Sequence, residues 1–280
     1  MKRPISLCTL FLAIFAFCTG LLLHFGAQAC AGELQKQLTN ESAIEQIAKR
    51  GSIRVGLDVF VPWAMKDKKG ELIGFEVDVA KKLAEDAGIK LELVPTEWSG
   101  IIPALIAGKF DVIIGGMTVT AERNLKINFT NAYYFTGQGL LANRKMAADM
   151  TITDFNKPEV TLAARMGSTA AVTAKKVFPK ATLRLFDTEP AAVQEVRNGR
   201  VHGMVAGQPL PVQQAAGSPE ILIAYPEQLM QEPIAMGLRK GDIDTLNFLN
   251  NWIAQVQASG WLEEHYQYWF ESTEWQGLVQ

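Results

Sequence analysis

Residues 74–94 read GFEVDVAKKLAEDAGIKLELV. A helix is predicted over residues 75–87, because apolar residues recur there at the three- and four-residue spacing that places them on one helix face. The residues on that face are Val79, Ala80, Leu83, Ala84 and Ala87. Gly88 is expected to end the helix, and residues 91–94 are predicted to form a strand. A further strand is predicted at residues 53–57, so the stretch lies within a strand–helix–strand unit.

This alternation continues toward the C-terminus. A second helix is predicted from Ser99 to Ala107, and it leads to an apolar strand at residues 110–114 that suits a central position in a sheet. The alternation restarts with a strand at residues 160–164, a helix at 169–177 and a strand at 182–186. Such alternation is typical of α/β proteins with mainly parallel sheets.

Two extended stretches, residues 139–143 and 234–238, separate these units, and helices are expected to end the chain. We therefore expect an α/β fold of two lobes, each a mainly parallel sheet flanked by helices, with a hinge of two crossing segments. Lobe 1 is predicted to comprise residues 32–141 and 236–280, and lobe 2 residues 142–235. A cleft between such sheets is a common place for a small ligand.

The composition excludes several classes of protein. The 280 residues are 48% hydrophobic and 20% charged, which is typical of a folded chain, and the formal net charge of −2 lacks the basic excess of a nucleic-acid-binding surface. All three cysteines lie within the first 30 residues, so the rest of the chain holds no Cys-based zinc site and no Cys nucleophile. The three histidines show no paired metal spacing. We therefore expect no metal, no cofactor and no nucleic-acid partner.

The N-terminus has the layout of a secretory signal. Lys2 and Arg3 precede an uncharged apolar run from Ile5 to Ala27, and A-x-A cleavage patterns follow. The alternative interpretation is a membrane anchor, because the run is near the length that spans a bilayer. Residues 1–31 are expected to direct export of the chain to the periplasm and then to be cleaved off. Residues 26–30 also resemble a bacterial lipobox, in which case residues 1–29 are the signal and Cys30 is lipidated.

Five segments together resemble the periplasmic amino-acid-binding proteins, the family 3 solute-binding components of ABC importers. The segments are residues 74–84, 98–105, 110–123, 129–134 and 261–270. The resemblance covers roughly residues 45–272, and it implies the type II periplasmic-binding-protein fold. It also implies a monomer that captures a polar amino acid or an amino-acid derivative by hinge closure and delivers it to an ABC permease, without being an enzyme.

The resemblance assigns most of the candidate ligand-binding residues. Arg123 matches the arginine that clamps the ligand carboxylate, and bidentate Arg–carboxylate pairing explains why an arginine serves there. Gly116 and Thr118 match positions that donate hydrogen bonds to the ligand. Thr169 matches the residue that grips the carboxylate from the other lobe, at a helix N-terminus with free N–H groups.

Other matched positions are expected to form the pocket walls and to contact the ligand side chain. Phe60 and Trp98 match the aromatic walls, whereas Asp58 and Arg165 match positions that contact the far end of the ligand. The chain departs from the family at Gln208, which stands where an Asp commonly receives the ligand ammonium. An uncharged amide accepts such a bond more weakly than a carboxylate does.

Two alternatives to a transport protein remain. Some proteins of this fold are cyclohexadienyl or arogenate dehydratases, which use a carboxyl group in the cleft as a general acid. Residues 201–217, where such enzymes carry their acid, contain no Asp or Glu. The other alternative is a sensory ligand-binding module that acts through a partner.

Overall fold

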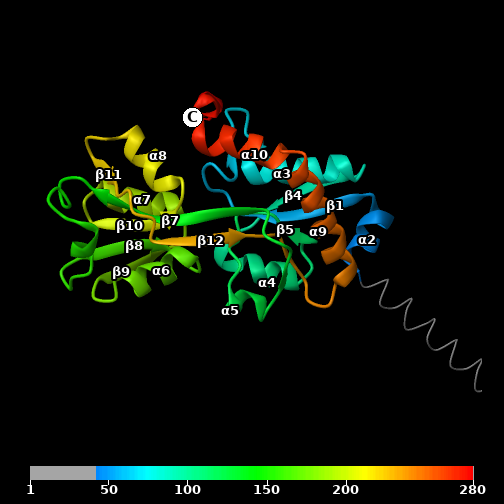
Figure 1. Ribbon diagram of the computed structural model, residues 1–280, viewed down its shortest axis with the longest axis horizontal. Coiled ribbons are helices and arrows are strands. Elements are labelled where there is room, and N and C mark those ends of the chain that lie inside the picture. The colour runs from blue at the N-terminus through cyan, green and yellow to red at the C-terminus, as the bar shows by residue number, and fades with distance from the viewer. Residues whose placement is uncertain (1–41, 280) are drawn as a thin grey trace, which may run out of the picture.

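The chain forms two lobes, each built on its own sheet (Figure 1). The structure is a computed structural model that describes residues 42–279. The sheet of lobe 1 has the strand order β4-β1-β5-β13-β6, and the sheet of lobe 2 has the order β11-β7-β10-β8-β9, with β12 also paired to β7. The predicted signal segment, the membrane-anchor alternative and Cys30 lie outside the described residues.

The sheet of lobe 1 is part parallel and part antiparallel. Strand β1 (Ser52–Leu57) pairs in parallel with β4 (Lys90–Pro95) on one side and β5 (Val112–Ile113) on the other. Strand β13 (Gly237–Leu238) then joins antiparallel between β5 and β6 (Asn128–Phe129). The central strand β5 and its neighbour β13 are therefore separated in the sequence by all the strands of the second sheet.

The predicted strand at residues 110–114 is shorter than expected, and the expectation that it is apolar is wrong at Asp111, which carries a buried charge just before β5. Asp111 is fully buried and forms ion pairs with Arg50 and Arg54, the latter at 2.7 Å. Its carboxylate also accepts the backbone N–H of Arg54 at 2.8 Å, so the charge is compensated by several partners. The central position of this strand is confirmed.

Helix α3 (Phe75–Asp86) forms where the sequence predicts it and buries the apolar face, including Val79 and Leu83. The chain continues as αR at Ala87 and turns at Gly88, whose φ of +65° is left-handed. The other helices of lobe 1 are α2 (Ala43–Arg50), α4 (Ile101–Ile106), α5 (Ala121–Asn124), α9 (Ile243–Ala258) and α10 (Trp261–Tyr266). A π-helical turn over Gln267–Glu271 continues α10.

Lobe 2 has a parallel core of three strands. Strand β8 (Thr161–Arg165) lies between β9 (Thr182–Phe186) and β10 (Gly203–Gly207) and is parallel to both. Strand β11 (Leu222–Ala224) pairs antiparallel with β7. The helices of this lobe are α6 (Thr169–Val177), α7 (Glu189–Arg197) and α8 (Leu210–Gly217).

Two antiparallel strands link the lobes. They are β7 (Tyr134–Asn143) and β12 (Met230–Ile234), and all of β12 pairs with the first half of β7, from Tyr134↔Ile234 to Gln138↔Met230. Both cross the middle of the molecule side by side in Figure 1. The predicted boundary between residues 141 and 142 falls inside β7. All the pairings of β7 lie in the second sheet, which favours a first passage of the chain from lobe 1 to lobe 2 before Tyr134. The exact division into lobes stays a prediction.

Aromatic packing fixes the start of β7 against lobe 1. The Tyr134 ring stacks on Tyr266 and on Phe270, with centroids 4.5 and 5.9 Å apart. Trp63 and Phe75 complete this cluster edge-on. Such ring pairs add to the free energy of burial, so one end of the hinge is held rigidly.

Within residues 42–279, no helix combines the length and the apolar character that crossing a bilayer requires.

Candidate functional site between the lobes

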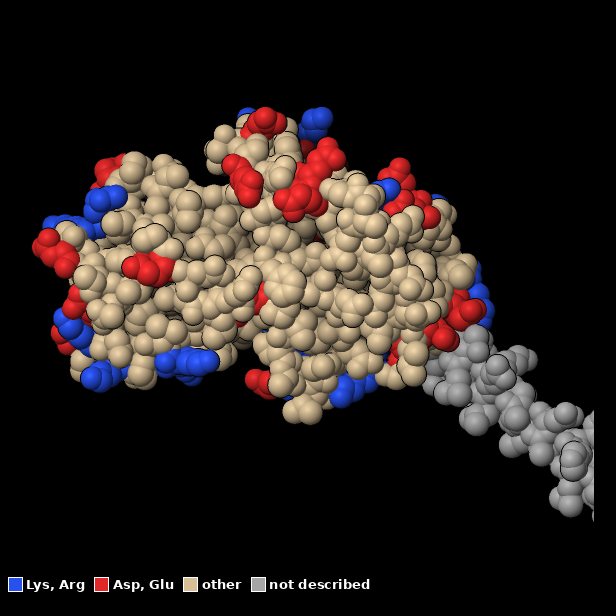
Figure 2. All heavy atoms as spheres, viewed as in Figure 1, with Lys and Arg blue, Asp and Glu red and all other residues tan. Residues whose placement is uncertain are grey.

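A small cavity lies where the lobes meet the two linking strands. Its volume is ≈ 40 Å³. Both lobes contribute its lining, which includes Phe60, Trp63, Trp98, Gly116, Thr118, Thr136, Gln138, Arg165, Ser168, Thr169, Glu189, Gly207 and Glu232. Figure 2 shows the molecule hollowed between its two halves at the upper and lower edges, and the middle of this face is mainly uncharged.

Glu232 on β12 is the acidic centre of the cavity. Its side chain is 3% exposed, and its Oε2 accepts hydrogen bonds from the Thr118 and Thr169 hydroxyls at 2.8 and 2.9 Å. The Gln138 amide on β7 donates a third bond to the same oxygen at 2.8 Å. Thr118 belongs to lobe 1 and Thr169 begins α6 of lobe 2, so one carboxylate joins the lobes and the hinge.

Arg123 lies at the outer side of this cluster. Its guanidinium donates to the Thr118 carbonyl at 2.9 Å and across the cleft to the Gly167 carbonyl at 3.1 Å. Burial lowers the pKa of Arg123, although the nearby Glu232 carboxylate raises it. Arg123 also borders a larger groove of ≈ 750 Å³, which shares Trp98, Ser168 and Thr169 with the cavity.

Arg165 crosses the cleft from the end of β8. Its guanidinium carbon lies 4.7 Å from the ring centre of Phe60 and 4.6 Å from that of Trp98. It pairs with Asp58 of lobe 1 at 2.7 Å and with Glu189 of its own lobe at 3.6 Å. Burial raises the pKa of both carboxyls, and the Arg165 charge opposes that rise.

The turn at Gly116 is held by Glu76, one of two acids in the first turn of α3. The Glu76 carboxylate is fully buried, accepts the Gly116 N–H at 2.8 Å and is bonded by the Tyr133 hydroxyl at 2.7 Å. Burial raises the pKa of Glu76 to about 7. The Gly116 N–H that was predicted to meet a ligand is therefore already bonded within lobe 1.

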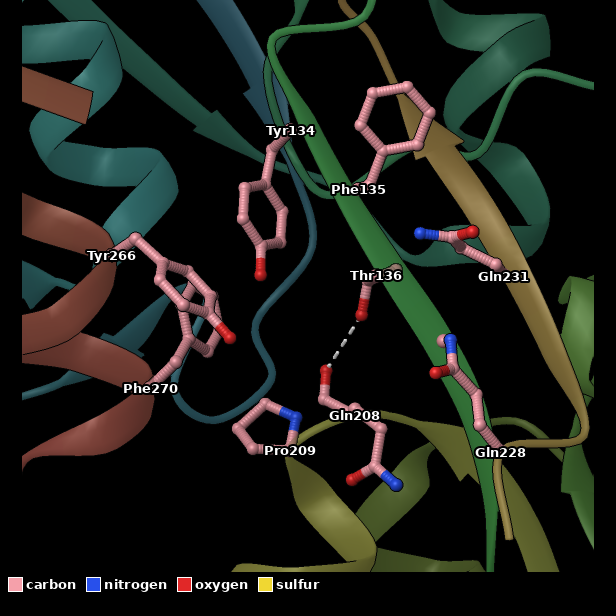
Figure 3. Close-up of a pocket in the computed structure, with 10 residues that line it drawn as sticks. Tyr134, Phe135, Thr136, Gln208, Pro209, Gln228, Gln231, Tyr266 and Phe270 are labelled. Atoms are coloured by element: carbon pink, nitrogen blue, oxygen red, sulfur yellow. Dashed lines mark hydrogen bonds between the residues drawn. The ribbon is translucent and has the colours of Figure 1, made fainter. Parts of the chain in front are cut away.

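Gln208 lies in a separate pocket beside the hinge. This pocket has a volume of ≈ 240 Å³ and is lined by Tyr134, Phe135, Thr136, Gly137, Gln208, Pro209, Gln228, Gln231, Tyr266 and Phe270 (Figure 3). The Thr136 hydroxyl donates to the Gln208 backbone carbonyl at 3.2 Å. The neighbour of Gln208 that lines the central cavity is Gly207, and the buried carboxylate there belongs to Glu232. Ligand contact at Gln208 stays a prediction.

Two polar atoms at the cavity are buried without a hydrogen-bond partner among residues 42–279. They are the Arg165 Nε–H, a donor, and the Gln138 Oε1, an acceptor. An unpaired buried polar group costs roughly 1–3 kcal/mol, so such atoms favour a site that a polar ligand completes. The same part of the chain holds no cluster of three His, Cys, Asp or Glu side chains fit to bind a metal.

The sequence model of the bacterial extracellular solute-binding proteins, family 3, matches residues 53–272. The chain belongs to this family. The L-cystine-binding protein TcyJ of Escherichia coli (strain K12) is 26% identical to this family 3 protein over 260 residues, which cover 89% of this chain and 97% of TcyJ. Cyclohexadienyl dehydratase of Pseudomonas aeruginosa is 25% identical and covers 88% of this chain and 91% of its own length.

Solved structures confirm the predicted type II periplasmic-binding-protein fold of this family 3 protein. A protein of Wolinella succinogenes in complex with lysine matches with a TM-score of 0.77 and 42% identity, and it covers 81% of this chain and 99% of its own. The relatives are mostly amino-acid-binding proteins.

The structure brings most of the predicted site residues to one place. Phe60, Trp98, Gly116, Thr118, Arg165 and Thr169 line the cavity, and Asp58 pairs with one of them. Arg123 lines the adjoining larger groove and donates to the Thr118 carbonyl. Glu232, Gln138 and Glu189 also line the cavity, and none of them was predicted from the sequence. One signal could have found Glu232: it is an acid directly before the extended stretch 234–238, where a crossing segment was expected.

Proposed function

We propose that this chain is the extracytoplasmic binding protein of an ABC importer and captures a polar amino acid between its lobes. The observation that carries the proposal is the convergence of Arg123, Thr118, Thr169 and Glu232 from both lobes and the hinge. Arg123 and the two hydroxyls suit an α-carboxylate, and Glu232 suits an α-ammonium. Charge-assisted bonds of this kind are about twice as strong as neutral ones.

Capture would proceed by hinge closure. The lobes are linked by β7 and β12, and they touch through bonds from Trp98 and Arg123 to the Gly167 carbonyl at 3.2 and 3.1 Å. A cavity of ≈ 40 Å³ is small for an amino acid, which supports separation of the lobes for ligand entry. A ligand that binds groups on both lobes then favours the closed arrangement.

Export and partnership are part of the same proposal. The family match supports a location outside the cytoplasmic membrane, reached through the N-terminal segment. The partner would be an ABC permease, and we expect the binding protein to act as a monomer without a cofactor or catalytic residue.

An enzyme of the dehydratase type is the alternative, supported by the relative from Pseudomonas aeruginosa. Glu232 is the buried carboxyl that a dehydratase would need in its cleft, but its Oε2 already accepts three hydrogen bonds. A carboxylate held in this way suits an ammonium acceptor better than a proton donor. Turnover of prephenate or arogenate by the purified protein would favour the enzyme.

A thermal-shift screen of amino acids, amides, opines and keto acids tests the proposal. A ligand at 100 times its Kd stabilises the native state by about 2.7 kcal/mol, which raises Tm by roughly 5–10 °C in a protein of this size. The Arg123→Ala variant should fold normally and show no shift. Undiminished binding by Arg123→Ala in calorimetry would refute the carboxylate clamp.

A further inference from the structure

The Phe60 and Trp98 rings of lobe 1 form a slot that holds a cation. The rings lie 6.3 Å apart at 70° to one another, and the Arg165 guanidinium sits within 5 Å of both ring centres. Cation–π attraction is strongest where the cation is removed from water. Arg165 is 5% exposed, so this condition is met.

Two carboxylates flank the Arg165 guanidinium in this slot. Asp58 meets Nη1 of Arg165 at 2.7 Å, and Glu189 lies 3.6 Å from Nη2. Their side chains are 19% and 9% exposed, so water screens neither fully. Two aromatic faces and two carboxylates are the surroundings that a lysine or arginine side chain requires, and a residue of the chain itself fills them.

We infer that Arg165 determines ligand specificity by occupying the position of a basic ligand side chain. The cleft then takes zwitterionic amino acids with an uncharged polar side chain and rejects lysine and arginine. This inference rests on the proposed function, because it assumes an amino-acid ligand.

The unpaired atoms at the cavity agree with such a ligand. The Arg165 Nε–H is a free donor that suits an amide or hydroxyl oxygen, and the Gln138 Oε1 is a free acceptor that suits an N–H group. An acidic side chain is disfavoured, because it would meet Asp58 and Glu189, whereas a basic one would meet the Arg165 charge.

Calorimetry on the full mature chain tests the inference with glutamine, asparagine, serine, lysine and arginine as probes. The wild-type protein should bind at least one neutral polar probe tenfold or more tightly than lysine and arginine. Arg165→Gln should gain at least tenfold in affinity for lysine or arginine. The double variant Asp58→Asn/Arg165→Gln should lose this gain, because the carboxylate that would pair with the ligand is removed.

Arg184→Gln is the matched control. Arg184 also stacks on an aromatic ring, Phe186, and pairs with a carboxylate, Glu195, but lies on β9 outside the cavity. It should keep the wild-type order of affinities. Wild-type binding of lysine as tight as that of the neutral probes would overturn the inference, whether or not the variants fold.

A folded Arg165→Gln that gains nothing for basic amino acids would also overturn it. If neither the wild type nor Arg165→Gln binds any amino acid in a complete screen, the proposed function fails and the inference falls with it. If neutral amino acids bind but the switch is absent, only the inference fails.

Discussion

Glu76→Gln tests whether a buried carboxyl beneath the binding turn controls stability with pH. Burial raises the pKa of Glu76 from an ordinary 4.5 to about 7. Between these values the folded chain holds a proton that the unfolded chain releases, so the free energy of unfolding falls as pH rises. From pH 5 to pH 8 the linkage relation gives a loss of about 2.5 kcal/mol.

Glutamine reproduces the protonated carboxyl. Its carbonyl can accept the Gly116 N–H, and its amide can donate to the Tyr133 hydroxyl oxygen. The stability of Glu76→Gln relative to wild type should therefore rise by about 2.5 kcal/mol between pH 5 and pH 8, because the contributions of all other groups cancel in the difference.

Urea denaturation at both pH values provides the measurement. Glu85→Gln is the control, because Glu85 lies on the same helix with its side chain exposed. Its stability relative to wild type should change by less than ~0.5 kcal/mol. If the free energy of unfolding of Glu76→Gln relative to wild type is also the same at pH 5 and pH 8, the Glu76 carboxyl is already ionised at pH 5 in the folded protein and the reasoning is wrong.

Four further substitutions have defined outcomes. Gly56→Ala should destabilise the chain by roughly 1–3 kcal/mol in urea denaturation, because an added Cβ would lie 2.4 Å from the Phe110 ring. Ser168→Ala should cost about 1 kcal/mol by the same assay, because the Ser168 hydroxyl caps α6; an unchanged midpoint would contradict this. Glu232→Gln should weaken amino-acid binding at least tenfold in calorimetry, because the ammonium loses its charged acceptor. Gln208→Asp should leave affinity within twofold, because Gln208 lines the separate hinge pocket, and a large gain would show that it reaches the ligand.

Local patterns predicted the elements of lobe 2 well. Helix α6 (Thr169–Val177) and strand β9 (Thr182–Phe186) have the predicted bounds. Ser168 supplies a strong cap, and alternating short elements leave little freedom for the ends. By contrast, the two-residue strands β6 and β13 exist only because tertiary pairing holds them. A pattern of side chains carries no signal for such short pieces.

The site was predictable where it follows family motifs and not where the hinge supplies it. Arg123 and Thr118 lie in a quoted motif, whereas Glu232 and Gln138 meet from strands 94 residues apart. Register between β7 and β12 decides which side chains share a face, and sequence periodicity alone does not give that register. The partners of Arg165 could not be predicted either, because Asp58 and Glu189 come from different lobes and meet only in the folded chain.

The position of β13 gives the chain an order of assembly. Residues 134–234 are contiguous and contain every strand of the second sheet. The first sheet needs residues 237–238 between β5 and β6, so it stays incomplete until the segment that follows lobe 2 in the sequence is in place. Because domains generally fold as units, the lobe that begins first in the sequence is completed last.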